Sequence, residues 1–220
     1  MNTPFYNASV AFGRFVFWQT MRLHLIRPEL PDREGGYILA LTHLGNIDPF
    51  CSSVLQRRPI RWMTRKEFFV FPPFRWYLNL CGAFSVNRQG IPVSSIRRAI
   101  TLAREGHVVG ICPEGGVKRK AEAAFRGGRI RKGVSSVAIR SGVPVIPCVM
   151  LGTPALNRVR PWLPFRNAKL WVAYGEPLTP PQVRSNRAKR DDLRDQLSQA
   201  YVQLYAELRQ RFSLDDAAVP

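Results

Sequence analysis

A histidine and an aspartate lie five positions apart where a short apolar run of the chain ends. The run over residues 36–41 predicts a buried strand, and His43 and Asp48 follow it in a polar, glycine-containing turn. A histidine titrates near neutral pH, and it accepts a proton from a hydroxyl best when a carboxylate orients its ring. The spacing therefore predicts a catalytic base. The competing interpretation is an ordinary helix start that Asn46 or Asp48 caps.

Further polar residues follow other predicted strands and suit the binding of an anionic substrate. Glycines after a strand let a ligand approach the backbone and leave N–H groups available to an anion. A run of seven basic residues over 118–132 suits phosphates in the same way. The alternatives without a binding function are an ordinary strand-to-loop turn for the glycines and a solvent-exposed face for the basic run. The candidate substrate contacts are Arg88, Glu114, Gly115, Gly116, Lys118 and Arg119.

Strands alternate with helices along most of the chain, which predicts an α/β fold. We expect a single domain with a largely parallel central sheet flanked by helices. The expected strands cover 36–41, 60–63, 83–86, 107–112, 143–151 and 169–174, and the expected helices cover 4–25, 47–56, 93–105, 133–141 and 187–212. Ligands bind beyond the carboxyl ends of such strands, so His43, Arg88 and Glu114 should meet at one edge of the sheet.

Two aromatic segments are unusual for a soluble domain. The helix expected over 4–25 carries many aromatic residues together with Arg14 and Arg22. It suits either packing on the core or an amphipathic, membrane-associating helix with its arginines among lipid headgroups. The segment 66–78 suits a second membrane-facing element or the wall of an apolar tunnel. We divide the chain into an N-terminal interfacial helix and connector (1–35) and a catalytic domain (36–220).

The charge balance implies an anionic partner. The 220 residues hold 33 Lys and Arg against 15 Asp and Glu, a net charge of +18, and 45% are hydrophobic, which excludes a disordered chain. Charge alone leaves phosphate-bearing ligands, an anionic membrane and nucleic acid open. We expect no secretory leader and no membrane-spanning helix. The four widely spaced cysteines suit buried apolar positions in a reducing compartment. His24 and His107 are not spaced as partners of His43, so no metal site is predicted.

Four stretches stand in a recognisable order. They are Thr42–Asp48, with His-x4-Asp; Gly82–Arg88; Cys112–Val117, with Pro-Glu-Gly; and Val143–Pro147, with Val-Pro-x-x-Pro. In these blocks the chain resembles the glycerolipid (lysophosphatidic acid) acyltransferase family, and Lys132-Gly133 is similar to a Lys-Gly pair of that family. The resemblance covers roughly residues 36–151.

The resemblance implies a membrane-associated O-acyltransferase without a prosthetic cofactor. His43, oriented by Asp48, would deprotonate the free hydroxyl of a lysophospholipid. That hydroxyl would attack the thioester of acyl-coenzyme A or acyl carrier protein. The expected acceptor is 1-acylglycerol 3-phosphate, and the product is phosphatidic acid. The expected location is the cytoplasmic face of the cell membrane, peripheral or monotopic, on an anionic lipid surface, with no nucleic acid as partner.

One block departs from the family pattern. Gly116 and Val117 stand where the family has Thr and Arg, and Lys118 or Arg119 would substitute for the missing cation, or the acceptor differs. Two alternatives therefore stay open. The chain acylates another lysolipid, or it is a non-catalytic basic protein that binds anionic membrane or nucleic acid.

Overall fold

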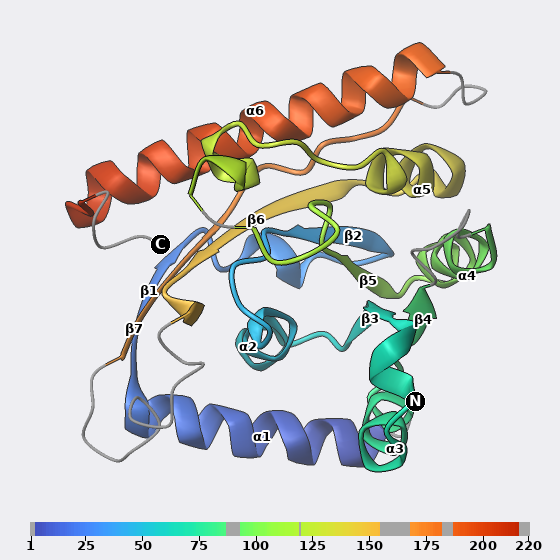
Figure 1. Ribbon diagram of the computed structural model, residues 1–220, viewed down its shortest axis with the longest axis vertical. Coiled ribbons are helices and arrows are strands. Elements are labelled where there is room, and N and C mark those ends of the chain that lie inside the picture. The colour runs from blue at the N-terminus through green and yellow to red at the C-terminus, as the bar shows by residue number, and fades with distance from the viewer. Residues whose placement is uncertain (1–2, 87–92, 119, 155–167, 182–186, 216–220) are drawn as a thin grey trace.

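A mixed sheet forms the centre of the computed structural model, which describes residues 3–86, 93–118, 120–154, 168–181 and 187–215 (Figure 1). Its strands are β1 (Met21–Ile26), β2 (Tyr37–Leu41), β3 (Ile60–Arg65), β4 (Phe84–Val86), β5 (Val108–Ile111), β6 (Val145–Leu151) and β7 (Ala168–Tyr174). Within this part of the chain the strand order is β1-β7-β6-β2-β5-β3-β4. The five strands from β6 to β4 are parallel, whereas β7 is antiparallel to β6 and β1 is parallel to β7. The predicted α/β fold with a largely parallel sheet is confirmed.

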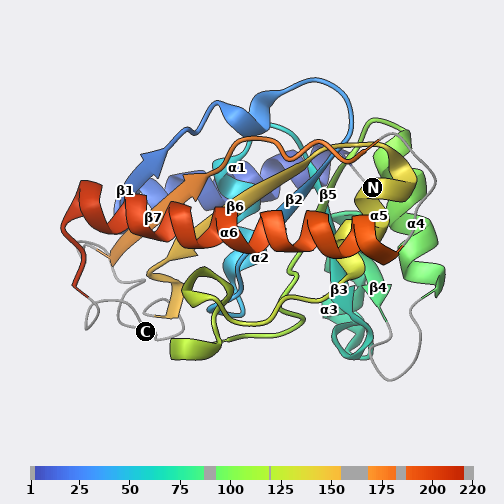
Figure 2. The ribbon, with the colours of Figure 1, turned by 90° about the horizontal axis from the view of Figure 1, so that it is seen from above.

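Helices cover both faces of the sheet. The described helices are α1 (Thr3–Thr20), α2 (Asp48–Leu55), α3 (Pro72–Leu80), α4 (Val93–Arg104), α5 (Gly133–Ser141) and α6 (Arg187–Phe212), with 3₁₀ turns at Leu30–Asp32, Lys66–Phe69, Lys120–Glu122 and Ala124–Arg126. One hydrophobic cluster joins α4, α5 and α6 to the sheet, and a second joins α1 and α2 to its other face. Figure 1 shows α6 and α1 on opposite sides, and from above α6 lies along the sheet (Figure 2).

The central strand β2 is buried along its whole length. Every residue from Tyr37 to Leu41 is buried, because β5 and β6 pair with its two edges while helices cover its two faces. On one face the hydroxyl of Tyr201 in α6 donates a 2.9 Å hydrogen bond to the carbonyl of Ala40. The apolar side of α6 is as predicted: Leu193, Leu197, Tyr201, Leu204, Tyr205 and Leu208 are its buried residues.

The prediction of one helix over 4–25 is wrong at its end. The helix stops at Thr20, whose hydroxyl donates to the carbonyl of Val16 at 2.7 Å, and Met21–Ile26 form the edge strand β1. This strand pairs with residues 168–173, which lie far away in sequence and leave no local signal at 21–26. The proposed division of the chain at residue 35 stays a prediction, but β1 precedes that point and is part of the sheet.

The side chain of Arg14 is predicted to lie among lipid headgroups, but in the structure it contacts α2. Its guanidinium donates to the carbonyls of Val54, at 3.0 Å, and Gln56, at 2.8 Å, where α2 ends. These carbonyls have no partner within the helix, and a cation there also complements the helix dipole. Arg14 therefore joins α1 to α2. In the described part of the chain, no helix combines the length and the apolar character needed to cross a membrane.

The close packing of β5 against β3 gives a stability prediction. A β-carbon on Gly110 would overlap the ring of Trp62, which is fixed because its Nε1 donates to the hydroxyl of Ser53 at 2.9 Å. We expect Gly110→Ala to lower the free energy of unfolding by about 1–3 kcal/mol, measured by urea denaturation. The control is Gly133→Ala, where an added β-carbon meets no atom within 4 Å, and its stability should not fall. Equal stabilities for the two variants would contradict the prediction.

Candidate active site

His43 leaves the sheet at the carboxyl end of β2. The preceding residue, Thr42, is still held by β6, because its N–H donates to the carbonyl of Cys148 and its hydroxyl accepts from the N–H of Met150. The next residue turns away from the sheet toward α2. The two hydrogen bonds of the buried Thr42 to β6 thus place His43 just beyond the end of β2.

Asp48 holds both the ring of His43 and the turn that carries it. Its Oδ2 lies 3.1 Å from Nδ1 of His43 and accepts hydrogen bonds from the N–H groups of Leu44, at 2.7 Å, and Gly45, at 2.9 Å. The aspartate is completely buried at the start of α2. Its hydrogen bonds run back into the turn. The residue at the cap position is Ile47, without a side-chain capping bond, so the helix-cap interpretation is wrong.

This arrangement suits a general base. When Nδ1 of His43 donates its proton to Asp48, Nε2 carries the free lone pair. The imidazole borders a cavity, so a substrate hydroxyl there can deliver its proton to the ring. Protonated His43 would be stabilised by the adjacent carboxylate of Asp48, as in the His-Asp pair of serine hydrolases.

Glu114 connects the His43 turn to a second loop. Its side chain is 3% exposed, Oε2 accepts from the N–H of His43 at 2.5 Å, and Oε1 accepts from the N–H of Ala124 at 2.7 Å. Burial raises the pKa of Glu114 from its ordinary 4.5 to about 7, against the opposing effect of these two hydrogen bonds. The carboxyl group thus holds the His43 turn and the 3₁₀ turn Ala124–Arg126 together.

The cavity beside His43 has a volume of about 850 Å³ and a largely apolar lining. Its polar end is bordered by His43 and the segment 114–118. Its apolar walls come from separate elements, among them Val10 of α1, Trp62 of β3, Ile111 of β5, and Phe68, Phe74 and Tyr77 of the aromatic segment. The tunnel-wall interpretation of that segment is therefore supported. The volume lies in the range of ordinary ligand sites.

The structure brings most of the predicted site residues together. His43, Glu114, Gly115, Gly116 and Lys118 all border the cavity, and Asp48 lies directly behind His43. The N–H of Lys118 donates to the carbonyl of His43 at 2.8 Å, and its Nζ is paired with Glu122 at 2.7 Å. Arg88 and Arg119 lie outside the described residues.

Two arginines outside the six named candidate contacts also border the cavity: Arg65, which the sequence reasoning did not select, and Arg131, which belongs to the basic run over 118–132. Arg65 ends β3, so the rule that ligands bind at the carboxyl ends of strands would have found it. Arg131 precedes α5, and its guanidinium packs against Gly115, where a β-carbon would overlap its Nε. That contact joins residues 16 positions apart across a loop and has no local sequence signal.

The comparisons with known proteins show the family to which the chain belongs. Residues 22–151 match the model of a family described as Acyltransferase, and the chain therefore belongs to this acyltransferase family. The family resemblance drawn from the four blocks is confirmed, and the chain is an enzyme of the acyltransferase class. The non-catalytic alternative is not supported.

Among similar proteins is a "1-acyl-sn-glycerol-3-phosphate acyltransferase" of Bacillus subtilis (strain 168). It is 29% identical over 146 residues, which are 66% of this chain and 68% of that protein. A protein of Chlamydomonas reinhardtii with the same activity in its name is 29% identical over 132 residues, 59% of this chain but 38% of that protein. The chain is also similar to the crystal structure of the 1-acyl-sn-glycerophosphate (LPA) acyltransferase PlsC from Thermotoga maritima. The TM-score is 0.69 at 19% sequence identity, and the match covers 91% of this chain and 80% of that chain. The two proteins therefore share a fold.

The buried Glu114 predicts a pH dependence of stability. Between pH 4.5 and about 7 the folded state keeps a proton on Glu114 that the unfolded state has lost, so the free energy of unfolding falls as pH rises through this window. The expected total is on the order of 3 kcal/mol. Glu114→Gln lacks this titration. Subtracting its urea-denaturation profile from that of the wild type cancels the other groups, and a difference that stays constant with pH would contradict the prediction.

Proposed function

We propose that this acyltransferase transfers a fatty acyl group from a thioester to the free hydroxyl of 1-acylglycerol 3-phosphate, giving phosphatidic acid. The observation that carries the proposal is the His43–Asp48 pair, held at 3.1 Å with the imidazole facing an apolar cavity. The names of the relatives from Bacillus subtilis and Chlamydomonas reinhardtii support the choice of acceptor. The thioester donor is acyl-coenzyme A or acyl carrier protein, and the reaction needs no prosthetic group.

The reaction proceeds by direct transfer. Nε2 of His43 removes the proton from the acceptor hydroxyl as its oxygen attacks the thioester carbonyl. The tetrahedral intermediate collapses, the C–S bond breaks, and the proton on His43 passes to the leaving sulfur. Asp48 stabilises the imidazolium in between. The apolar cavity suits an acyl chain, because its aromatic and aliphatic walls replace the bilayer around the chain.

A second acceptor class is favoured by one observation. Gly116 and Val117 stand in place of the Thr and Arg of the family pattern, next to the cavity. A different lysophospholipid headgroup would fit this change. A panel of lysophospholipids with one long-chain acyl-coenzyme A, read by mass spectrometry of the products, separates the two. Phosphatidic acid as the main product supports the first proposal, and another diacyl phospholipid as the main product supports the second.

Removal of the base should abolish most of the turnover. We expect His43→Ala to lower kcat by roughly 10²–10⁴-fold, since a positioned general base contributes about that factor. Asp48→Asn should also lower it, because the amide cannot stabilise the imidazolium. Thiol release from acyl-coenzyme A in the presence of 1-acylglycerol 3-phosphate measures both. The control is His107→Ala, at the amino end of β5 beside Glu105, which should keep wild-type turnover. Wild-type turnover by His43→Ala would refute the assignment.

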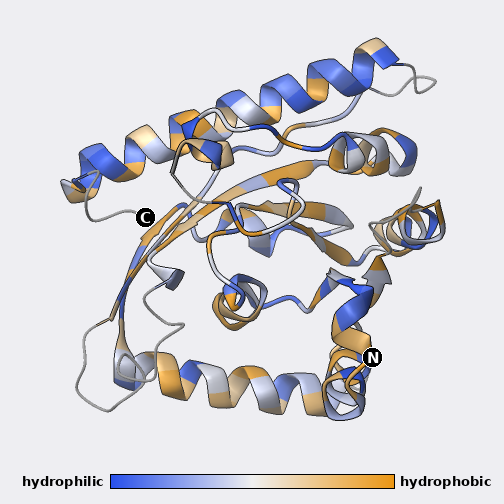
Figure 3. Cartoon of the chain, in the orientation of Figure 1, coloured by the Kyte–Doolittle hydropathy of each residue, from blue (hydrophilic) through white to orange (hydrophobic). Residues whose placement is uncertain are grey.

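We also propose that the protein attaches to the cytoplasmic face of an anionic membrane through one aromatic surface. Phe12, Phe15 and Trp18 of α1 are 58–77% exposed, and Phe71 and Trp76 beside and within α3 are 66% and 61% exposed. The rings of Phe5 and Trp76 meet at 5.3 Å and join the two helices. Hydrophobic residues recur along α1, on the side of the molecule away from α6 (Figure 3). Exposed aromatics of this number mark an interaction surface.

This placement would deliver substrate directly. The segment that contains α3 borders the cavity with Phe74 and Tyr77 and exposes Phe71 and Trp76 on its outside. One element therefore separates the acyl-chain cavity from the proposed bilayer. A lysolipid leaving the bilayer would pass this element, and its hydroxyl would reach His43 without its chain crossing open water.

Polar replacement of the α1 aromatics should release the protein from membranes. We expect the triple change of Phe12, Phe15 and Trp18 to Ser to weaken binding to vesicles of phosphatidylcholine and phosphatidylglycerol by roughly 100-fold or more, given about 1.5–3 kcal/mol per buried large side chain. Vesicle co-sedimentation measures this. Val202→Ser on α6 is the control, since Val202 is 43% exposed on the opposite side of the sheet. Equal binding of the triple variant and the wild type would rule out α1 as the attachment surface.

A further inference from the structure

The loop after Glu114 carries the cations Lys118, Arg119 and Lys120, of which Arg119 lies outside the described residues. Val117 occupies the place of the family's arginine, and the next cation, Lys118, is engaged by Glu122 at 2.7 Å. A lysine whose charge is already paired is a weaker ligand for a phosphate than an unpaired one, because the anion must compete with the carboxylate. Among the described residues, a cation without a carboxylate partner at this end of the cavity would therefore bind the acceptor's phosphate more strongly than Lys118 does.

Arg131 is placed to be that group. Its exposed side chain borders the cavity together with Glu114, Gly115 and Lys118. Gly115 has φ +75°, and a β-carbon there would overlap Nε of Arg131, so the side chain lies directly over the glycine. Among the described residues Arg131 forms no ion pair. No carboxylate of the described residues therefore competes with an anion for its guanidinium beside the turn that follows Glu114.

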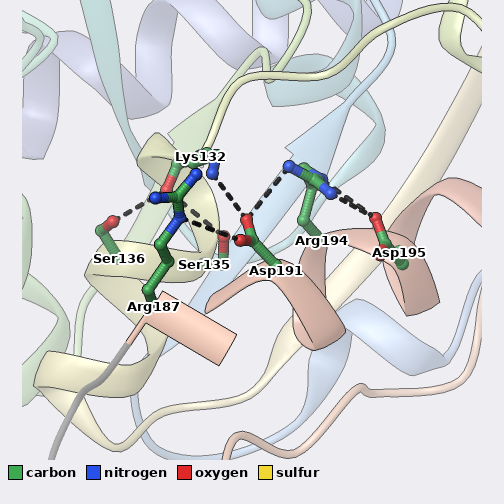
Figure 4. A network of polar contacts seen from close by, with 7 residues as sticks. All are labelled: Lys132, Ser135, Ser136, Arg187, Asp191, Arg194 and Asp195. Atoms are coloured by element: carbon green, nitrogen blue, oxygen red, sulfur yellow. Dashed lines mark hydrogen bonds and ion pairs between the residues drawn. The ribbon is translucent and has the colours of Figure 1, made fainter. Parts of the chain in front are cut away.

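A backbone hydrogen bond of Arg131 and an ion pair of the neighbouring Lys132 fix the position of this segment. Its N–H donates to the carbonyl of Pro113 at 2.8 Å, which ties it to the end of β5. The neighbouring Lys132 extends to α6, where its Nζ lies 2.8 Å from Oδ1 of Asp191 (Figure 4). Asp191 is itself held by Arg194 at 3.1 Å. The short segment is therefore anchored at β5 and at α6.

A chain of short contacts connects this position to the catalytic base. Arg131 lies over Gly115, the residue that follows Glu114, and Glu114 accepts from the N–H of His43 at 2.5 Å. Gly133 and Val134, at the amino end of α5, border the same cavity and add the positive end of a helix dipole to the charge of Arg131. A hydroxyl at His43 and a phosphate at Arg131 can thus belong to one small molecule.

We propose that Arg131 is the phosphate ligand of the acceptor in this chain, in place of the arginine that Val117 has replaced. The group recognised is a phosphomonoester on a glycerol, which a planar guanidinium binds through two parallel hydrogen bonds. The ion pair of Lys132 with Asp191 positions the ligand and does not touch the phosphate. The inference rests on the proposed function, because it assumes that the acceptor carries a phosphomonoester.

The first experiment measures binding without turnover. Glycerol 3-phosphate, the headgroup without its acyl chain, is titrated into the full-length protein by calorimetry. Arg131→Gln should weaken binding about 10- to 100-fold, the factor expected for a hydrogen bond to a charged group, and Arg131→Lys should retain part of it. The matched control is Arg129→Gln, an exposed arginine two positions away that does not border the cavity, which should bind like the wild type. Equal affinity of Arg131→Gln and Arg129→Gln, or no binding by the wild type, would overturn the proposal.

The second experiment identifies the source of the phosphate, since coenzyme A also carries a phosphomonoester. Arg131→Gln should raise the KM for 1-acylglycerol 3-phosphate, leave the KM for acyl-coenzyme A unchanged, and lose the preference for that acceptor over 1-acylglycerol. A rise confined to acyl-coenzyme A would overturn the assignment to the acceptor. A wild type that binds glycerol 3-phosphate through Arg131 but does not acylate 1-acylglycerol 3-phosphate would refute the proposed function and leave the ligand assignment intact.

Discussion

The parallel pairing of β2 with β5 determines where His43 meets the carboxylate of Glu114. Ala40 pairs with Ile111, so the chain leaves both strands at the same height, three residues before His43 on one side and three before Glu114 on the other. The hydrogen bond between the N–H of His43 and Glu114 follows from that register. A shift of one strand by one residue would turn its side chains to the opposite face of the sheet and break this contact. The site therefore depends on how the sheet is paired before it depends on any side chain.

Two buried carboxyl groups stabilise the site in different ways. Asp48 is completely buried, but one of its oxygens is surrounded by two N–H groups and the imidazole of His43. Glu114 bridges two loops and has its pKa raised to about 7 by burial. Keeping a carboxyl group here costs stability at neutral pH, because a buried charge is poorly solvated. In return for this loss of stability, Glu114 keeps the His43 turn in position. This agrees with the general trade-off between stability and the geometry of functional sites.

The sequence predicted those parts of the structure that depend on short stretches of chain. The His43–Asp48 pair is separated by five positions, and the apolar side of α6 follows a helical period from Leu193 to Leu208. Both patterns are therefore visible in a short stretch of sequence. Strand β1 pairs with β7 across 147 positions, and the antiparallel direction of β7 depends on its pairing with β6, 20 to 26 positions earlier, so no local pattern records either. Arg14 was misread for a similar reason: its partners are the end carbonyls of α2, 40 and 42 positions away.

The same distinction explains why the base is easier to recognise than the contacts with the acceptor. His43 and Asp48 occupy one turn, and a change at either would disrupt the other at once. An anion in the cavity can instead be held by any cation that borders it, from β3, from the turn after β5 or from the segment before α5. A valine at position 117 therefore leaves the fold and the His43–Asp48 pair intact. Arg131 lies over Gly115, whose missing β-carbon leaves room for the guanidinium, so the proposed phosphate contact needs no change in the backbone around Glu114.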